Sequence, residues 1–69
     1  MEINWIDGFS VRVRTEGKQT VVAGNAAGLR SLAGILLSLA GQSPGAHVHL
    51  DEFNSLEDGS DELILEKTE

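Results

Sequence analysis

The sequence predicts a small α+β domain in which one helix packs on one face of a mainly antiparallel, single-layer sheet. Three observations support this class. Short segments that alternate between apolar and polar side chains flank one helical segment, turn signals separate them, and no linker divides the 69 residues. The expected order is β-β-β-α-β-β within a single domain, residues 1–69.

Three strands are expected before the helix, at residues 2–6, 9–15 and 19–23. The first is the β-prone run Glu-Ile-Asn-Trp-Ile, which ends at the turn signal Asp7-Gly8. The second alternates between an apolar and a basic face, with Phe9, Val11 and Val13 on one side and Arg12 and Arg14 on the other. A turn at residues 16–18 leads into the third strand, so these segments are expected to form an antiparallel meander.

The helix is expected at residues 26–40, with Asn25 as its N-cap and Gly41 as the C′ residue that stops it. Its apolar positions follow helical spacing and are expected to face the sheet: Ala26, Leu29, Leu32, Ala33, Leu36, Leu37 and Ala40, widened by Ile35 and Leu39. The side left for solvent is small and holds one charge: Arg30, Ser31, Gly34 and Ser38. Two interpretations of this side stay open, namely cover by nearby chain or a flat contact surface for a second protein.

Two further strands are expected after the helix, at residues 46–52 and 62–67, joined by a polar loop with a turn signal at Asp58-Gly59. In the first, the inward residues are expected to be Ala46, Val48 and Leu50, and the outward ones His47, His49 and Asp51. In the second, Leu63 and Leu65 are expected to point inward, and Glu62, Ile64 and Glu66 outward.

The charge is unevenly distributed along the chain. Residues 1–50 hold three acidic and four basic residues, a net charge of +1, whereas residues 51–69 hold eight acidic residues and one lysine, a net charge of −7. Such an acidic region repels nucleic acid and attracts basic proteins. A solubilising surface is the alternative interpretation.

Composition excludes several other classes. The chain has no cysteine, so it can form neither disulfides nor thiolate metal sites. No apolar run is long enough to span a membrane and no secretory signal is visible, so we expect a cytoplasmic protein without a membrane partner. Nucleophile elbow, P-loop and dinucleotide-binding motifs are all missing, and we therefore expect a binding module rather than an enzyme.

The histidines of the fourth expected strand raise the question of a metal site. His47, His49 and Asp51 alternate, so they would share one face of the strand, and two His plus a carboxylate can bind zinc or iron. Against this, the chain has no third histidine, and the same residues suit a solvent-facing strand surface. The acidic stretch 51–62 also lacks the spacing of an EF-hand loop. We expect neither a metal nor another cofactor, with these three residues as the only weak candidates.

Phe53 and Leu56 are apolar residues among acids. Either they form an exposed anchor for a protein partner, or they fold back to close the end of the core. Trp5, the only tryptophan, is expected to be structural. The candidate partner-binding residues share one stretch of chain: His49, Asp51, Glu52, Phe53, Asn54, Glu57 and Asp58.

Several runs in this sequence resemble the immunity protein 32 family: Gly24-Asn25, residues 28–33 (Gly-Leu-Arg-Ser-Leu-Ala), residues 47–60 (His-Val-His-Leu-Asp-Glu-Phe-Asn-Ser-Leu-Glu-Asp-Gly-Ser) and residues 62–66 (Glu-Leu-Ile-Leu-Glu). The resemblance covers about residues 19–67. It implies a small bacterial α+β protein of a polymorphic toxin system that neutralises its cognate toxin by direct binding. Together with the charge, it leads us to expect a basic toxin such as a nuclease, or another basic protein, as partner. The alternative is a metal-binding or homodimeric structural protein.

Overall fold

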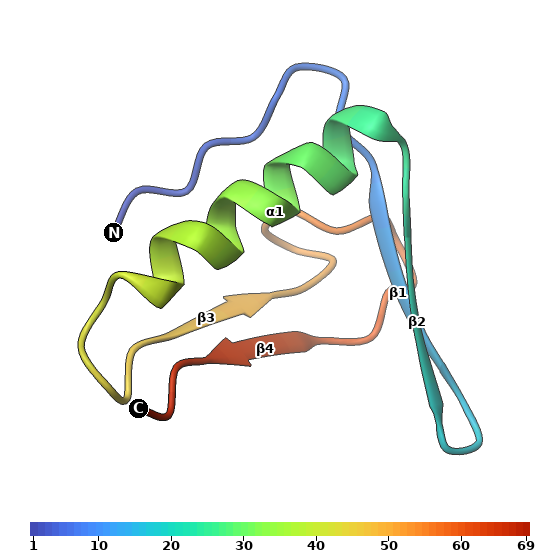
Figure 1. The fold of residues 1–69 in the computed structure, drawn as a ribbon. Helices are drawn as coiled ribbons and strands as arrows, with labels where there is room; N and C mark the ends of the chain where they lie inside the picture. Colours follow the sequence, from blue (N-terminus) through green and yellow to red (C-terminus); the bar gives the residue numbers. More distant parts are fainter.

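The computed structural model describes residues 1–69 and contains four strands and one helix (Figure 1). In chain order these are β1 (Val11–Glu16), β2 (Gln19–Gly24), α1 (Ala26–Ala40), β3 (His47–Leu50) and β4 (Leu63–Glu66). The fold is therefore α+β, as expected, but its order is β-β-α-β-β rather than β-β-β-α-β-β.

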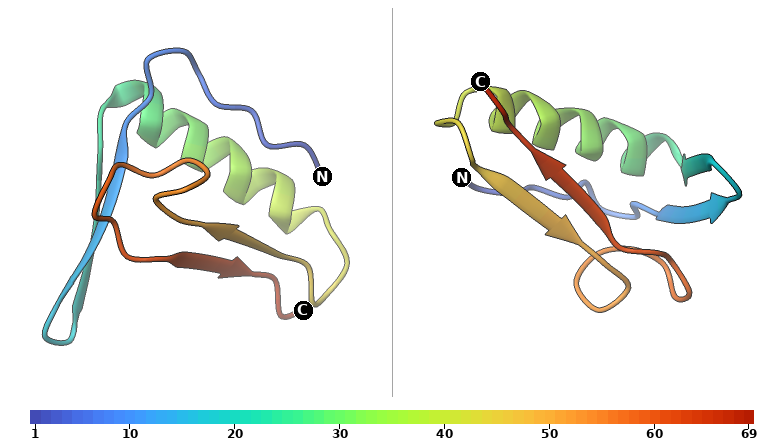
Figure 2. Two further views of the ribbon diagram at one scale, coloured as in Figure 1. Left: turned by 180° about the vertical axis from the view of Figure 1, so that it is seen from behind. Right: turned by 90° about the horizontal axis from the view of Figure 1, so that it is seen from below.

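The strands form two separate antiparallel sheets instead of one. β1 pairs with β2 from Val11 opposite Gly24 to Glu16 opposite Gln19. β3 pairs with β4 from His47 opposite Glu66 to Leu50 opposite Leu63. The β3–β4 sheet lies along one side of α1, and the β1–β2 hairpin stands across the end where the helix begins (Figures 1 and 2). The prediction of one single-layer sheet is therefore wrong.

The loop between β3 and β4 explains why the sheets do not merge. The Glu57 N–H donates to the Val11 carbonyl (2.9 Å), and the Asp61 N–H donates to the Val13 carbonyl (2.9 Å). The Val13 N–H donates in turn to Ser60 Oγ (3.2 Å). The backbone groups on the outer edge of β1 are therefore hydrogen-bonded to this loop, and no further strand pairs with that edge.

The N-terminal residues 1–10 contain no strand, contrary to the expectation for residues 2–6. The Ile6 N–H donates to Ser31 Oγ on α1 (2.8 Å), and the chain runs along the helix instead of joining a sheet (Figure 1). The expected turn at Asp7-Gly8 is present, with Gly8 at φ +81°. Trp5 stacks on Phe9, with ring centroids 4.4 Å apart, and packs against the core, which confirms its structural role.

The helix has the bounds expected from the sequence, and Asn25 caps it. Asn25 Oδ1 accepts the Gly28 N–H (2.7 Å) and the Ser10 N–H (3.0 Å). Gly41 does not supply a left-handed stop, because its φ is −85°. The carboxyl end of α1 is held by Lys67, whose Nζ donates to the carbonyls of Ala40 and Gln42, both at 2.7 Å.

The buried face of α1 differs from the expected one. Its buried residues are Gly28, Ser31, Ile35 and Leu39, whereas Ala26, Leu29, Ala33, Leu36, Leu37 and Ala40 are exposed. Gly28 explains this rotation, since a Cβ there would lie 2.2 Å from the Ser10 carbonyl oxygen. Only a glycine allows α1 to approach the start of β1 so closely. Ser31 is buried next to this contact, and its hydroxyl donates to the Ala27 carbonyl (2.7 Å).

The core lies between α1 and the two sheets. It consists of Val11, Val13, Ile35, Leu39, Val48, Leu50 and Leu56. The alternation in the strands is confirmed, because Val48 and Leu50 are buried while His47 and His49 are exposed. In β4, Leu63 and Leu65 are half-buried and Ile64 and Glu66 exposed, again as expected. No helix of the protein has the length and apolar character that crossing a bilayer requires.

Candidate partner-binding site

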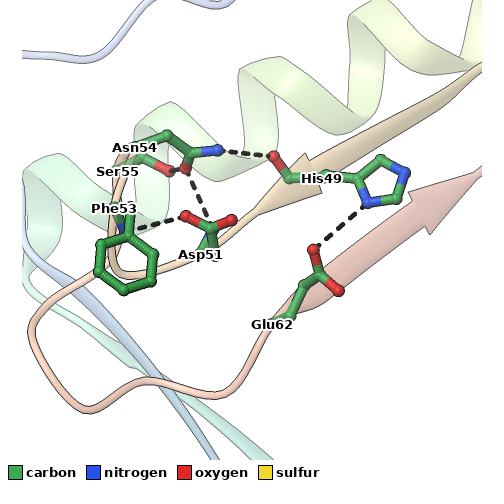
Figure 3. A network of polar contacts seen from close by, with 6 residues as sticks. All are labelled: His49, Asp51, Phe53, Asn54, Ser55 and Glu62. Atoms are coloured by element: carbon green, nitrogen blue, oxygen red, sulfur yellow. Dashed lines mark hydrogen bonds and ion pairs between the residues drawn. The ribbon is translucent and has the colours of Figure 1, made fainter.

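The loop that follows β3 is held in shape by Asp51. The Asp51 carbonyl accepts the N–H groups of Asn54 (3.3 Å), Ser55 (3.2 Å) and Leu56 (2.9 Å). Asp51 Oδ1 accepts the Phe53 N–H (2.9 Å) (Figure 3). The Asp51 carboxylate therefore shapes the turn, as Asp side chains commonly do, instead of projecting from the strand face beside the histidines.

Asn54 and Glu52 complete the internal bonding of the loop. Asn54 Oδ1 accepts the Asp51 N–H (3.1 Å), and Asn54 Nδ2 donates to the His49 carbonyl (3.1 Å). Glu52 Oε2 accepts the Gly59 N–H (2.7 Å), which joins the two ends of the loop. Three of the seven candidate residues thus position the loop. For Asp51 and Asn54 the residue types themselves are a signal of this role, because Asp and Asn side chains commonly bond to nearby backbone groups in turns.

Phe53 and Leu56 separate into opposite environments. Leu56 is 5% exposed and belongs to the core, which confirms for this residue that it closes the end of the core. Phe53 is 90% exposed, the most exposed large apolar side chain of the chain. Because the loop backbone is fixed on both sides of Phe53, its ring is presented to solvent from an ordered turn (Figure 3).

The remaining acids of the loop have carboxylates without a partner inside the chain. Glu57 and Asp58 are exposed, and their carboxylates accept no hydrogen bond within the chain. Arg12 reaches this region, but its Nη1 donates to the Asp58 backbone carbonyl (2.8 Å), not to a carboxylate. Arg14 forms an ion pair with Glu16 (2.7 Å), and the His49 ring lies 3.4 Å from the Glu62 carboxylate. The carboxylates of residues 51–69 are therefore not neutralised by the cations of the first hairpin.

Two residues with structural roles were not singled out in the sequence. Asp61 Oδ2 accepts both the N–H (2.9 Å) and the hydroxyl (3.0 Å) of Thr15, so it fastens the loop to the end of β1. Lys67 is the only cation in residues 51–69. Its ammonium group is engaged at the end of α1, and it is therefore not available to screen the loop.

The two histidines lie side by side on β3, whereas Asp51 belongs to the turn that follows it. The rings of His47 and His49 are edge to face, with centroids 5.0 Å apart. His47 Nδ1 lies 3.1 Å from the Gly45 carbonyl, and His49 Nδ1 lies 3.4 Å from Glu62 Oε2. No three residues of metal-ligating type come close enough together to hold an ion. His47, His49 and Asp51 are therefore not gathered into one cluster.

One open groove of about 520 Å³ lies beside β3, at the side opposite β4. Leu39, Met1 and Ile3 contribute apolar walls, and the polar side chains of the lining are those of Gln42, His47 and His49. The groove contains no Ser, Thr, Asp or Glu, so no nucleophile or carboxylate accompanies the two imidazoles. Six of the seven candidate partner-binding residues lie in the acidic loop, and only His49 lines this groove.

The fold and this loop define a small α+β protein that presents an ordered acidic turn with one exposed aromatic ring and no assembled catalytic set. The family model for immunity protein 32 matches residues 19–68, and the chain belongs to this family. Membership implies a role in neutralising a toxin, and it supports a non-enzymatic protein. The match includes β2, α1, β3, β4 and the loop, while β1 and the N-terminal segment precede it. No curated protein and no solved structure matched the chain.

Proposed function

We propose that this protein neutralises a basic toxin, such as a nuclease domain, by binding it through the loop Asp51–Asp58 with His49 at its edge. The observation that carries the proposal is the exposure of Phe53, 90%, on a turn fixed by hydrogen bonds on both sides. Large aromatic side chains presented in a rigid setting contribute disproportionately to binding energy.

The charges of the loop support a basic partner. Glu57 and Asp58 follow the turn, and their carboxylates have no internal partner, so binding a cation at these carboxylates breaks no contact within the fold. Residues 51–69 carry a net charge of −7, which attracts a cationic domain and speeds the encounter. In this proposal the acids govern the association rate, and Phe53 governs the lifetime of the complex.

Titration calorimetry with the cognate toxin domain tests the role of Phe53. Phe53→Ala is expected to weaken binding by about tenfold to a hundredfold, as for a central aromatic anchor. The matched control is Leu37→Ala, because Leu37 is 77% exposed on α1, outside the loop. Equal affinities for both variants and the unmodified protein would exclude Phe53 as the anchor.

Stopped-flow association tests the charges separately. The double variant Glu57→Lys with Asp58→Lys is expected to slow association about tenfold or more at low salt, and added salt should reduce the difference. The control is Glu2→Lys with Asp7→Lys, which changes the net charge by the same amount at exposed positions far from the loop in the sequence. If both double variants slow association equally, only the total charge matters and the loop is not the docking face.

A further inference from the structure

The exposed side of α1 carries a regular apolar seam. Its members recur at alternating spacings of three and four residues: Ala26, Leu29, Ala33, Leu36 and Ala40. This is the a/d pattern through which helices pack side by side, with the small residue at each a position and leucine at each d position. All five are exposed, and Leu29 and Leu36 are 48% and 47% exposed.

Most of the seam faces solvent, although the Leu29 side chain also lies close to Gly24 of β2, where an added Cβ would be 3.4 Å from it. Ala33 lies about 160° around the helix axis from the buried Ile35, given 100° per residue. In the right-hand view of Figure 2, α1 forms the outer boundary of the molecule, with β3 and the N-terminal segment on its other side. An a/d pattern facing solvent, in a protein whose core has only seven buried apolar residues, indicates a partner helix.

The charge distribution favours a second copy of this chain as that partner. Two chains of net charge −6 repel each other wherever their acids meet. No acidic residue occurs between Gly17 and Leu50, and Arg30 is the only charge in α1. The seam is therefore a surface at which two copies can meet without bringing carboxylates together. A basic toxin, in contrast, finds no opposite charge there.

We propose that two copies associate through this seam around a two-fold axis that passes near Ala33. Ala33 is the middle member of the seam and lies seven residues from each end, so antiparallel helices place Ala33 opposite Ala33 and Ala26 opposite Ala40. The alanines allow close approach, the leucines fill the spaces between them, and antiparallel helix dipoles attract. The loop Asp51–Asp58 remains free in both copies.

The size of the seam sets the strength of the dimer. A helix of 15 residues is about 22 Å long, so the seam offers on the order of 200–400 Å² per chain, below the ~800 Å² per partner of stable complexes. We therefore expect a weak dimer that dissociates on dilution through the micromolar range.

Sedimentation equilibrium of the unmodified protein over a wide concentration range tests the association, and a matched pair of variants tests its location. Ala33→Glu places an acid in the seam, whereas Ser38→Glu adds the same charge at an exposed position of α1 outside it. We expect the unmodified protein and Ser38→Glu to reach twice the monomer mass at high concentration, and Ala33→Glu to remain monomeric with an unchanged far-ultraviolet spectrum.

Because the chain has no cysteine, Ala33→Cys is also expected to form a disulfide-linked dimer under mild oxidation, unlike Ser38→Cys.

Three results would overturn the proposal. If the unmodified protein has the mass of a monomer at every concentration, two copies do not associate, and the seam would have to bind a different protein. Dimers of equal strength in Ala33→Glu and Ser38→Glu would place the contact elsewhere on the surface. If Ala33→Cys and Ser38→Cys form disulfide-linked dimers to the same extent, the disulfides arise from random collisions between chains and not from a defined interface. None of these results depends on toxin binding, so they are independent of the proposed function.

Discussion

Two glycines of α1 are expected to respond in opposite directions to the same substitution. Gly28→Ala places a Cβ 2.2 Å from the Ser10 carbonyl oxygen and 2.8 Å from a Val11 methyl group. Gly34→Ala, six residues further on, places a Cβ with no neighbour within 4 Å. Both gain the higher helix propensity of alanine, so any difference between them measures the helix–strand contact alone.

The magnitude follows from these distances. Ordinary contact begins near 3.4 Å, so α1 and β1 must separate locally by about 1 Å to accept Gly28→Ala. Overpacking of this kind costs about 1–3 kcal/mol. The Ser10 carbonyl also accepts the Asn25 N–H (3.1 Å), and weakening that bond adds about 1 kcal/mol. After a propensity gain of about 1 kcal/mol, Gly28→Ala should lower the free energy of unfolding by about 2 kcal/mol, whereas Gly34→Ala should raise it by about 1 kcal/mol.

Urea unfolding followed by Trp5 fluorescence and by circular dichroism measures both values. In a domain of this size, whose total stability is about 3–5 kcal/mol, Gly28→Ala should leave a marginal fold. Gly34→Ala should raise the melting temperature by about 4–8 °C. If Gly28→Ala is as stable as the unmodified protein, or if both variants shift in the same direction, the close approach of α1 to β1 is not what selects the buried face of the helix.

Two other predictions concern the ends of α1. Asn25→Ala removes the acceptor for the Gly28 and Ser10 N–H groups, and it should lower the free energy of unfolding by about 2 kcal/mol in the same urea assay; a loss no larger than that of a surface substitution would contradict the capping role. Lys67→Met leaves two carbonyls at the end of the helix without their donor and should cost about 1–2 kcal/mol. Lys18→Met, at an exposed position without a hydrogen bond, is its control and should stay within about 0.5 kcal/mol of the unmodified protein.

The candidate site was predicted in part from the sequence. The exposure of His49, Glu57 and Asp58 follows from alternation and from turn composition, and the structure confirms it. The bonding of Asp51 and Glu52 was not predicted, because their partners are backbone N–H groups whose positions depend on the path of the whole loop. The sequence also left Phe53 and Leu56 with the same two alternatives, since a loop has no periodicity that assigns a side chain to one face.

The sequence by itself determined the features that depend on neighbouring residues. The bounds of α1, its cap at Asn25, the inward residues of β3 and β4 and the acidic carboxyl quarter are all encoded within a few positions of each other. Tertiary structure decided which face of α1 is buried, because that choice rests on the contact between Gly28 and Ser10, far apart in the chain. It also decided that the sheets stay separate, since the edge of β1 bonds a loop some 46 residues away. Periodicity identifies amphipathic elements, but only close packing and the pairing of backbone groups between distant segments determine their partners.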